Sequence, residues 1–486
     1  MTSPASPTFA GLDWSEGLRA AVELDAPLRD RVAALSDNVT FSVAVRNRLG
    51  RPLSVLGSEL RHAPLGALRP AEGAMERVAL SLEAKGLKIV RHGWFTLTAR
   101  GPAALVGELL GRRMTVHHRP RIRRREKRVR ADDLFLAPEP RASQLSVRHL
   151  HEEANDAFFA PPSCLYQPSA TPPVTAYPSL SVLAIRRLLG VPSGLSGAGV
   201  KVAIVDTGFE RHPYYTQGGF DLVSTSSGDP SGHGTAMPMN LLAVAPRASV
   251  RVFAESDGAP QDAVELAVEQ GAQIVSLSFG WSDENVQPVL ETTLRETRAK
   301  GVIVVVASGD GARSWPGDMP EILSVGGVFA DLDDGDALQV SNLASGYISD
   351  QYPGRIVPDV CGLCGQKPLG TYIPMPCPAG SDFDRRYAES DGTAPDDGWF
   401  VGSGTSAAAP QVAGVIALLL EQAAAAGVPL SPPQIVHLLQ QTCRVVSRGA
   451  NAMDIGASGN RPNAACGFGL VDATAAIAAL RTTPMV

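Results

Sequence analysis

After residue 180 the chain alternates short runs of β-branched residues with segments in which apolar residues recur at helical spacing. The short runs predict strands and the longer segments predict helices. The predicted strands are 200–205, 249–254, 273–277, 302–306 and 322–328. The predicted helices are 180–189, one starting at 233, 262–270, 286–300 and 411–420. This alternation predicts an α/β domain over 180–486, with helices on both faces of a parallel sheet.

A smaller α+β pattern precedes this domain. Residues 38–46 alternate apolar and polar positions, and residues 74–85 have helical spacing. The remaining predicted elements are strands 87–90 and 94–98, a helix at 102–111 and a strand at 114–118. Their order, βαββαβ, predicts a ferredoxin-like unit over 38–118. Ahead of it, helical spacing over 16–35 predicts that the extension 1–37 is partly helical.

The segment 119–179 differs in composition from both of these regions. It begins with a basic run: Arg119, Arg121, Arg123, Arg124, Arg125, Lys127, Arg128 and Arg130. Prolines follow at 138, 140, 161, 162, 168, 172, 173 and 178, and such density favours extended, exposed chain. We therefore predict a linker. It is either an activation linker, cut at or after the basic run, or a solvated charged connection.

Composition excludes some classes of function. The chain has 486 residues, 44% of them hydrophobic and 19% charged, with a net charge of −6. This balance argues against nucleic-acid binding, and the sequence shows no apolar run long enough to predict a membrane span. Charged residues interrupt positions 1–24, so no signal peptide is visible. We expect a cytoplasmic protein or one exported by a route that the sequence does not reveal, with an extracellular location as the alternative.

Cysteines and aspartates raise the question of metal sites. The cysteines stand at 164, 361, 364, 377, 443 and 466, and free thiols or one loop disulfide are expected. Cys361, Cys364 and Cys377 would suit a metal knuckle only with a fourth ligand at suitable spacing. Aspartates between 382 and 397 make calcium conceivable, whereas the acidic stretch 331–336 predicts a hairpin turn. No metal ligand is assigned, and no cofactor is expected.

The strongest candidate for chemistry is Ser406, which lies in a glycine-rich segment just ahead of an apolar helical stretch. The pattern places its hydroxyl on the first turn of a buried helix. Unpaired backbone N–H groups and the positive end of the helix dipole stabilise an oxyanion that forms there. Ser406 therefore suits a nucleophile, although a serine at this place can also be a helix cap.

Two further residues complete the constellation. Asp206 ends the predicted strand 200–205, and His233 stands between glycines at a predicted helix start. Each has a plain structural interpretation, as a turn residue and as a helix-cap or core histidine. Together with Ser406 they give the chain order Asp, His, Ser, which is one of the known orders of a catalytic triad.

These motifs resemble those of the subtilisin-like serine peptidases, or subtilases, over about residues 180–480. The resemblance implies a subtilisin-like fold, with Ser406 as nucleophile, His233 as general base and then acid, and Asp206 as the carboxylate that orients the imidazole. It implies a serine endopeptidase that hydrolyses peptide bonds through an acyl-enzyme, with a protein or peptide as substrate. The alternatives are a pseudoprotease that only binds, and an esterase or transpeptidase on the same fold.

Asp310 departs from the subtilase pattern, in which an asparagine usually donates to the oxyanion. The fragment 308–311 looks like that of the sedolisins, which carry an aspartate in this role. An ionised Asp310 would repel the oxyanion, so we expect burial to keep it protonated and able to donate. The alternative is that Asp310 faces elsewhere and the backbone N–H of Ser406 acts alone.

The same resemblance implies the substrate contacts. One wall, on which the substrate lies as an added strand, is formed by Ser278, Phe279 and Gly280. The facing wall of the pocket is formed by Ala307, Ser308 and Gly309. The Phe279 ring either narrows this pocket or lies in the core.

The unit 38–118 resembles a subtilase propeptide. That resemblance implies a folding chaperone and inhibitor whose tail occupies the active cleft, so the chain would be made as a self-inhibited zymogen. The alternative is a small independent binding domain.

Overall fold

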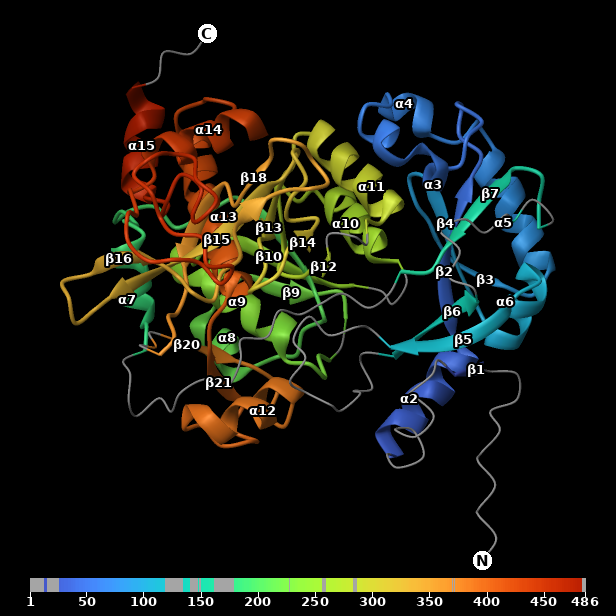
Figure 1. Cartoon of the computed structure of the whole chain (residues 1–486), viewed down its shortest axis with the longest axis horizontal. Helices are drawn as coiled ribbons and strands as arrows, with labels where there is room; N and C mark the ends of the chain where they lie inside the picture. Colours follow the sequence, from blue (N-terminus) through green and yellow to red (C-terminus); the bar gives the residue numbers. More distant parts are fainter. Residues whose placement is uncertain are drawn as a thin grey trace, which may run out of the picture. The chain divides into compact units, whose positions relative to one another are not determined.

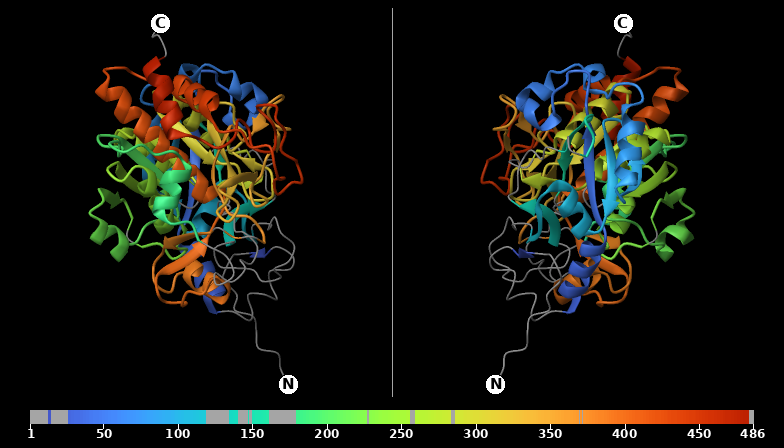
Figure 2. Two further views of the ribbon diagram at one scale, coloured as in Figure 1. Left: turned by 90° about the vertical axis from the view of Figure 1, so that its left-hand side faces the viewer. Right: turned by 90° about the vertical axis from the view of Figure 1, so that its right-hand side faces the viewer.

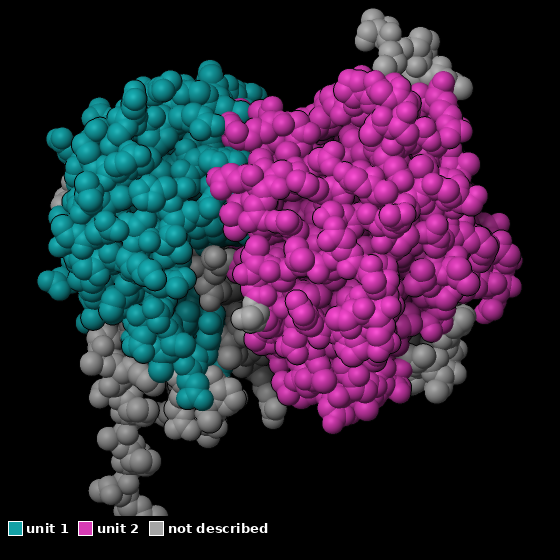
Figure 3. Space-filling model, turned by 180° about the vertical axis from the view of Figure 1, so that it is seen from behind, with its two compact units in different colours: residues 1–162, 256–265, 287–293 teal, residues 163–255, 266–286, 294–486 magenta. Residues whose placement is uncertain are grey.

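The computed structural model describes residues 13–14, 26–118, 134–139, 147, 150–160, 179–226, 228–255, 259–282, 286–368, 370 and 372–482. The chain divides into two compact units, which are coloured separately in Figure 3. Unit 1 comprises residues 1–162, 256–265 and 287–293, and unit 2 comprises residues 163–255, 266–286 and 294–486. Most of unit 1 precedes the predicted domain boundary at residue 180, and most of unit 2 follows it. The two short segments 256–265 and 287–293 belong to unit 1 although they lie after that boundary.

Unit 2 is built on a sheet whose strand order is β16-β15-β13-β11-β8-β10-β9, with β19 also paired to β15. The strands are β8 (Lys201–Asp206), β9 (Leu222–Ser224), β10 (Ser249–Ala254), β11 (Ile274–Leu277), β13 (Ile303–Ala307), β15 (Leu323–Asp331), β16 (Ala337–Val340) and β19 (Val360–Leu363). All pairs are parallel except β15 with β16. Every residue of β11 and β13 is buried, so both faces of the sheet are covered. The predicted fold class is confirmed.

Some of the helices after residue 180 pack against this sheet, and others lie farther from it (Figures 1 and 2). They are α7 (Val182–Leu188), α8 (Pro213–Gly218), α9 (His233–Val244), α10 (Pro260–Glu269), α11 (Pro288–Ala299), α12 (Asp382–Asp391), α13 (Thr405–Ala425), α14 (Pro432–Thr442) and α15 (Ala473–Thr482). Helices α10 and α11 begin in unit 1 and end in unit 2. Three short antiparallel ladders complete unit 2: β12 (Trp281–Ser282) with β14 (Ser314–Trp315), β17 (Tyr347–Ile348) with β18 (Ile356–Val357), and β20 (Ile373–Pro376) with β21 (Trp399–Gly402).

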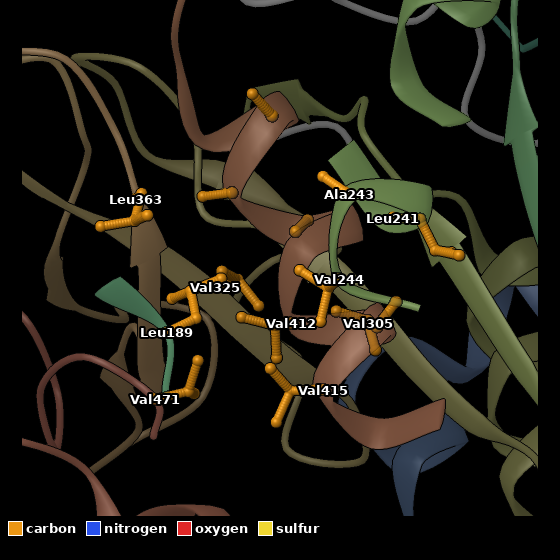
Figure 4. Close-up of a cluster of buried hydrophobic side chains, with 14 of the residues drawn as sticks. Leu189, Leu241, Ala243, Val244, Val305, Val325, Leu363, Val412, Val415 and Val471 are labelled. Atoms are coloured by element: carbon orange, nitrogen blue, oxygen red, sulfur yellow. The ribbon is translucent and has the colours of Figure 1, made fainter. Parts of the chain in front are cut away.

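The core of unit 2 is centred on α13, which packs along α9 and several strands of the sheet. Figure 4 shows Val412 and Val415 of this helix beside Val305 of β13 and Val244 of α9, and all of them are at most 1% exposed. By length and composition, α13 is the one helix among the described residues that could cross a membrane, and 78% of its most apolar window is buried. The sequence predicted only its middle part, 411–420.

Unit 1 contains a small antiparallel sheet with the order β3-β4-β2-β7. Its strands are β2 (Val39–Val45), β3 (Lys88–His92), β4 (Thr96–Gly101) and β7 (Ala154–Phe158), and its main helices are α5 (Ala74–Ala84) and α6 (Ala103–Leu110). These helices contribute Val78, Leu82 and Val106 to a core that also contains Phe41 and Leu97 of the sheet.

The predicted ferredoxin-like unit is wrong in its last strand. The strand at 114–118 exists as β5 (Arg113–His118), but it pairs with β1 (Asp13–Trp14) and β6 (Leu134–Glu139) in a separate sheet. The place beside β2 is taken by β7 instead. An alternating pattern shows which face of a strand is buried, but it does not reveal the partner.

The predicted linker is also partly folded. Strands β6 and β7 lie within 119–179, and Leu134, Leu136 and Ala154 are buried in the core of unit 1. The basic run and most of the prolines lie outside the described residues. The predicted helix at 16–35 is found later in the chain, as α2 (Ala26–Asp37), and residues 15–25 lie outside the described part.

Unit 1 also includes the beginnings of α10 and α11. Gln261 of α10 donates from Nε2 to Ser42 Oγ of β2 at 2.9 Å, and the backbone N–H of Trp94 donates to Glu265 Oε2 at 3.0 Å. Val289 of α11 packs in a cluster with Phe95 and Leu53. The amino-terminal segment therefore folds together with the first turns of these two helices.

Candidate active site

Asp206 and His233 form a buried pair at the carboxyl edge of the unit 2 sheet. Asp206 is the last residue of β8, and His233 is the first residue of α9. Their side chains are 0% and 2% exposed, and His233 Nδ1 lies 2.7 Å from Asp206 Oδ1. The same oxygen accepts the backbone N–H of Thr207 at 2.8 Å. Because a carboxylate only accepts, the imidazole donates from Nδ1 and its Nε2 is left to exchange protons.

The surroundings of His233 alter its basicity. Burial penalises the charged ring and by itself lowers the pKa of His233. The Asp206 carboxylate, through its charge and its hydrogen bond, raises that pKa, and Asp229 and Asp310 add to this effect. The charges outweigh burial, so the pKa of His233 is raised above its ordinary value. The histidine is therefore a stronger base than an isolated imidazole.

Asp229 organises the start of α9, and sequence reasoning missed it. The N-cap residue Gly232 has no side chain, and Asp229 supplies the missing acceptor from three residues earlier. Its Oδ2 accepts the N–H and the hydroxyl of Thr235, at 2.7 and 2.8 Å. Its Oδ1 accepts the N–H of Gly232 at 3.1 Å and the hydroxyl of Thr207 at 2.8 Å. An aspartate followed by a proline shortly before a helix start was the signal that could have revealed it.

Ser406 is the second residue of α13, as the sequence predicted, and it is 5% exposed. Its hydroxyl donates to the carbonyl of Ser278 at 3.0 Å, and the Ser278 hydroxyl donates to the carbonyl of Ser406 at 2.9 Å. His233 Nε2 has no hydrogen-bond partner within the described part of the chain. The serine-to-imidazole hydrogen bond is therefore not made in this arrangement. Rotation of the serine side chain about one bond between staggered positions redirects its hydroxyl.

Asp310 lies at the start of α13. Its Oδ1 accepts the N–H and the hydroxyl of Thr405, at 2.9 and 3.0 Å, so it caps the helix that carries Ser406. A Cβ atom on residue 404 would collide with its Oδ2, so only a glycine fits between the carboxyl and the nucleophile segment. Helix α13 packs along α9, so the helices that carry Ser406 and His233 are neighbours.

The predicted substrate walls follow neighbouring strands. Residues 278–280 continue β11, and residues 308 and 309 continue β13, whose last residue is Ala307; the two strands pair in parallel. The wall residues are buried, and Ser308 donates its hydroxyl to the carbonyl of Ser345 at 2.8 Å. The Phe279 ring is 1% exposed and meets the Trp281 ring edge-on, with centroids 5.7 Å apart. Its ring therefore has the core placement, which was one of the two expectations.

The aspartates between 382 and 397 mainly hold backbone turns. Asp384 Oδ2 accepts the N–H groups of Gly380 and Gly398, at 2.6 and 3.3 Å. Asp391 accepts the N–H groups of Thr393 and Val401, at 2.8 and 2.7 Å. No group of three or more metal-ligating side chains occurs among the residues described, and calcium binding stays a prediction.

The described cysteines, at 361, 364, 377, 443 and 466, are buried free thiols, and Cys164 lies outside the described residues. Burial is the main reason that the pKa of Cys377 is raised to about 12, so its thiol stays protonated near neutral pH. The expected hairpin at 331–336 is confirmed as the turn between β15 and β16.

Comparison with known proteins identifies the family. The Subtilase family profile matches residues 197–469, more than half of the chain. Subtilisin Savinase from Lederbergia lenta is 32% identical over 155 residues, which cover 27% of this chain and 57% of that protein. Thermitase from Thermoactinomyces vulgaris is 28% identical over 249 residues, which cover 46% of this chain and 76% of that protein.

Among solved structures, fervidolysin from Fervidobacterium pennivorans, described as a keratinolytic enzyme related to subtilisin, shares the fold. Its TM-score is 0.54 at 17% identity, over 92% of this chain and 61% of that one. The match to Subtilisin Savinase spans little more than half of that relative's length. The family match, the parallel sheet and the Asp206–His233 pair at its carboxyl edge agree, and the chain belongs to the subtilase family.

Proposed function

We propose that the protein is a serine endopeptidase that cleaves peptide bonds through an acyl-enzyme, with Asp206, His233 and Ser406 as its triad. The observation that carries the proposal is the buried hydrogen bond between His233 and Asp206. It leaves Nε2 to exchange protons, and Ser406 stands in the first turn of α13, a helix that packs along α9. Membership of the subtilase family supports the same chemistry.

In the proposed reaction, Ser406 turns from the carbonyl of Ser278 to His233 Nε2. The imidazole takes the hydroxyl proton while the oxygen attacks the carbonyl carbon of the substrate. Asp206 stabilises the imidazolium that forms, and the imidazolium then gives its proton to the leaving amine. A water molecule deprotonated by His233 attacks the acyl-enzyme, and the proton returns to Ser406 as the acid product leaves.

The oxyanion is stabilised by the start of α13 and by Asp310. Backbone N–H groups in the first turn of a helix have no partner within it, and the N–H of Ser406 is one of them. Asp310 is 5% exposed, and burial favours the neutral form of a carboxyl. Its Oδ1 accepts from Thr405, so in this proposal a proton on Oδ2 is donated to the oxyanion.

The substrate binds as an added strand along residues 278–280, with 307–309 as the facing wall. Both segments leave the carboxyl ends of adjacent parallel strands, where open α/β sheets bind their ligands. Backbone groups at such an edge recognise an extended peptide whatever its side chains are.

The amino-terminal part is proposed to be a propeptide that inhibits the enzyme until it is removed. Its sheet and the first turns of α10 and α11 share one compact unit, and these helices precede β11 and β13, the strands that lead into both substrate walls. A cut at or after the basic run 119–130 would separate the sheet strands β2, β3 and β4 from unit 2. Mass spectrometry of purified protein should find this cut in the wild type and not in Ser406→Ala.

The activity is tested with a fluorophosphonate probe and a peptide library across pH. The wild type is expected to be labelled at Ser406 and to cleave peptides, and Ser406→Ala to do neither. Ser403→Ala, which removes a neighbouring buried hydroxyl, is the matched control and should still be labelled. A wild-type protein that has been cut after the basic run and freed of the amino-terminal part, and that folds but is never labelled, would identify a pseudoprotease. Product analysis with water and amine acceptors separates a peptidase from a transpeptidase or esterase.

A further inference from the structure

The segment between β20 and β21 makes an excursion that begins and ends close to the nucleophile. We call residues 377–398 the α12 excursion. Its two ends are joined by the β20–β21 ladder, in which Pro376 pairs with Trp399. Strand β21 ends at Gly402, four residues before Ser406, so the root of the excursion is continuous with the nucleophile segment.

The tip of the excursion is bonded to the loop that leads into the histidine. The backbone N–H groups of Asp382 and Phe383 donate to the carbonyls of Pro230 and Ser231, both at 3.0 Å. These N–H groups belong to the first turn of α12, which has no acceptor for them within the helix. The neighbouring Gly232 has a φ of +90°, and a Cβ there would collide with Ser381. The excursion and the loop before His233 therefore fit closely.

The Phe383 side chain contacts the imidazole itself. Its ring lies 5.5 Å from the His233 ring, centroid to centroid, in a T-shaped arrangement with an interplanar angle of 63°. Tyr387 and Phe400 pack on Phe383, with centroids 5.5 and 5.2 Å away. Phe383 is 4% exposed, so its own position is well fixed.

A hydrogen bond at Nδ1 fixes one point of the imidazole but leaves its plane able to tilt. Contact with a fixed ring removes that freedom, because tilting would break a close-packed contact. The direction of Nε2 decides whether it can take a proton from Ser406 and deliver it to a leaving group. Small errors in such an alignment cost large factors in rate.

We infer that Phe383 is a positioning residue that sets the plane of the His233 ring, and that the α12 excursion ties the base to the nucleophile segment. The inference rests on the proposed function, in which His233 is the base. Asp206, Asp229 and Asp310 set the charge around the imidazole, and α12 presents to it an uncharged ring.

The test compares Phe383→Leu, Phe383→Tyr and Tyr387→Leu. Phe383→Leu keeps an apolar side chain without a flat ring, and it should lower kcat by at least tenfold while KM for a peptide changes less than twofold. Phe383→Tyr keeps the ring and should retain activity within threefold. Tyr387→Leu removes a ring of the same helix that stacks on Phe383, and it should lower kcat less than Phe383→Leu does. Thermal melts check that each variant is folded.

A second readout separates this inference from the proposed function. In a Ser406→Ala background, NMR titration follows the imidazole of His233 without any catalysis. Phe383→Leu should raise the pKa of His233 further, because water reaching the ring relieves the burial that opposes its charge, and Tyr387→Leu should not. Equal losses of kcat in the two leucine variants, or an unmoved His233 titration in Phe383→Leu, would overturn the positioning role. A wild type without Ser406-dependent activity but with the expected NMR shift would overturn only the proposed function.

Discussion

Helices α9 and α13 begin in the same unusual way, and the aspartates that cap them differ in the roles that we propose for them. Each has a glycine at its N-cap, Gly232 or Gly404, which offers no side-chain acceptor. In each case an aspartate from outside the helix caps it instead. Asp229 reaches the start of α9 from the preceding loop, and Asp310 reaches the start of α13 from the end of β13.

The two aspartates use their oxygens differently. Both oxygens of Asp229 accept hydrogen bonds. Oδ1 accepts from the Gly232 N–H and the Thr207 hydroxyl, and Oδ2 accepts from the N–H and the hydroxyl of Thr235. Asp310 caps α13 through Oδ1, and its Oδ2 lies against Gly404, which precedes Thr405 and Ser406. A carboxylate whose two oxygens both accept hydrogen bonds from the surrounding chain holds the fold. In the proposed mechanism Asp310 has a further role and gives a proton to the oxyanion.

The largest expected effect comes from the carboxylate that contacts the base directly. Asp206→Asn should lower kcat/KM by about 10,000-fold, since the amide no longer holds the correct tautomer of His233. Activity should fall at low pH as His233 becomes protonated. Because the pKa of His233 is raised, the midpoint of this acid limb of the pH profile should lie above the ordinary histidine pKa in the wild type. Loss of the Asp206 charge should move that limb to lower pH. Steady-state kinetics across pH measure both effects, and an unmoved limb would contradict the role of Asp206.

The next effect tests the catalytic half of the comparison. Asp310→Ala should lower kcat by about 100 to 1,000-fold, as expected for loss of an oxyanion donor. Asp310→Asn keeps an acceptor for Thr405 and donates at every pH. Relative to this variant, the wild type should lose activity as pH rises, because Asp310 then loses its proton and repels the oxyanion. Identical pH profiles for the wild type and Asp310→Asn would exclude Asp310 as the donor.

The sequence predicted unit 2 better than unit 1, for a physical reason. In unit 2 each β-branched run is followed by a helix, and parallel strands connected in this way have few possible arrangements. The sequence predicted β10 with its exact bounds. It predicted both ends of β8 and of β13 one residue too early. In unit 1 the alternating pattern does not decide which strands pair. Strand β7 was not predicted, because it lies in a segment rich in prolines.

At the site, the residues of the proposed triad could be identified from the sequence, and the residues that hold them were harder to identify. Asp206, His233 and Ser406 stand at strand ends and helix starts, which the local pattern reveals. Asp229 and Phe383 act through contacts with residues that are separated from them in the sequence or by a loop. No periodicity marks such contacts, so only the folded chain identifies them.

Asp229, which caps α9, should matter for the stability of the fold. Asp229→Asn replaces one accepting oxygen with an amide NH₂ group that faces hydrogen-bond donors. We expect the free energy of unfolding to fall by about 3 to 4 kcal/mol, because two donors lose their acceptor and the NH₂ group finds none in its place. Thermal or urea unfolding measures this loss. Asp206→Asn is the control, and it should lose far less stability than activity; a stable Asp229→Asn would contradict the assignment.

Glu265 tests the same principle in unit 1, away from any proposed chemistry. Its carboxylate accepts the N–H of Trp94 at 3.0 Å and the hydroxyl of Thr293 at 3.3 Å, and Arg91 Nε lies 3.6 Å away. Burial, aided by the charge of Asp262, outweighs these contacts and raises the pKa of Glu265 to about 7. A buried carboxyl that burial affects more than its hydrogen bonds do therefore resists ionisation rather than anchoring the fold.

The sign of the pH dependence follows from this raised pKa. Below the ordinary pKa of 4.5 the group is protonated in both the folded and the unfolded chain, so it has no effect. Between that value and about 7 the unfolded chain ionises more readily, and the free energy of unfolding falls as pH rises. Glu265→Gln keeps an acceptor for Trp94 and cannot ionise. At pH 8 it should stabilise the protein by about 3 kcal/mol, and at pH 4 by almost nothing. Unfolding measured at both values checks this, and a difference that does not depend on pH would show that folding does not raise the pKa of Glu265.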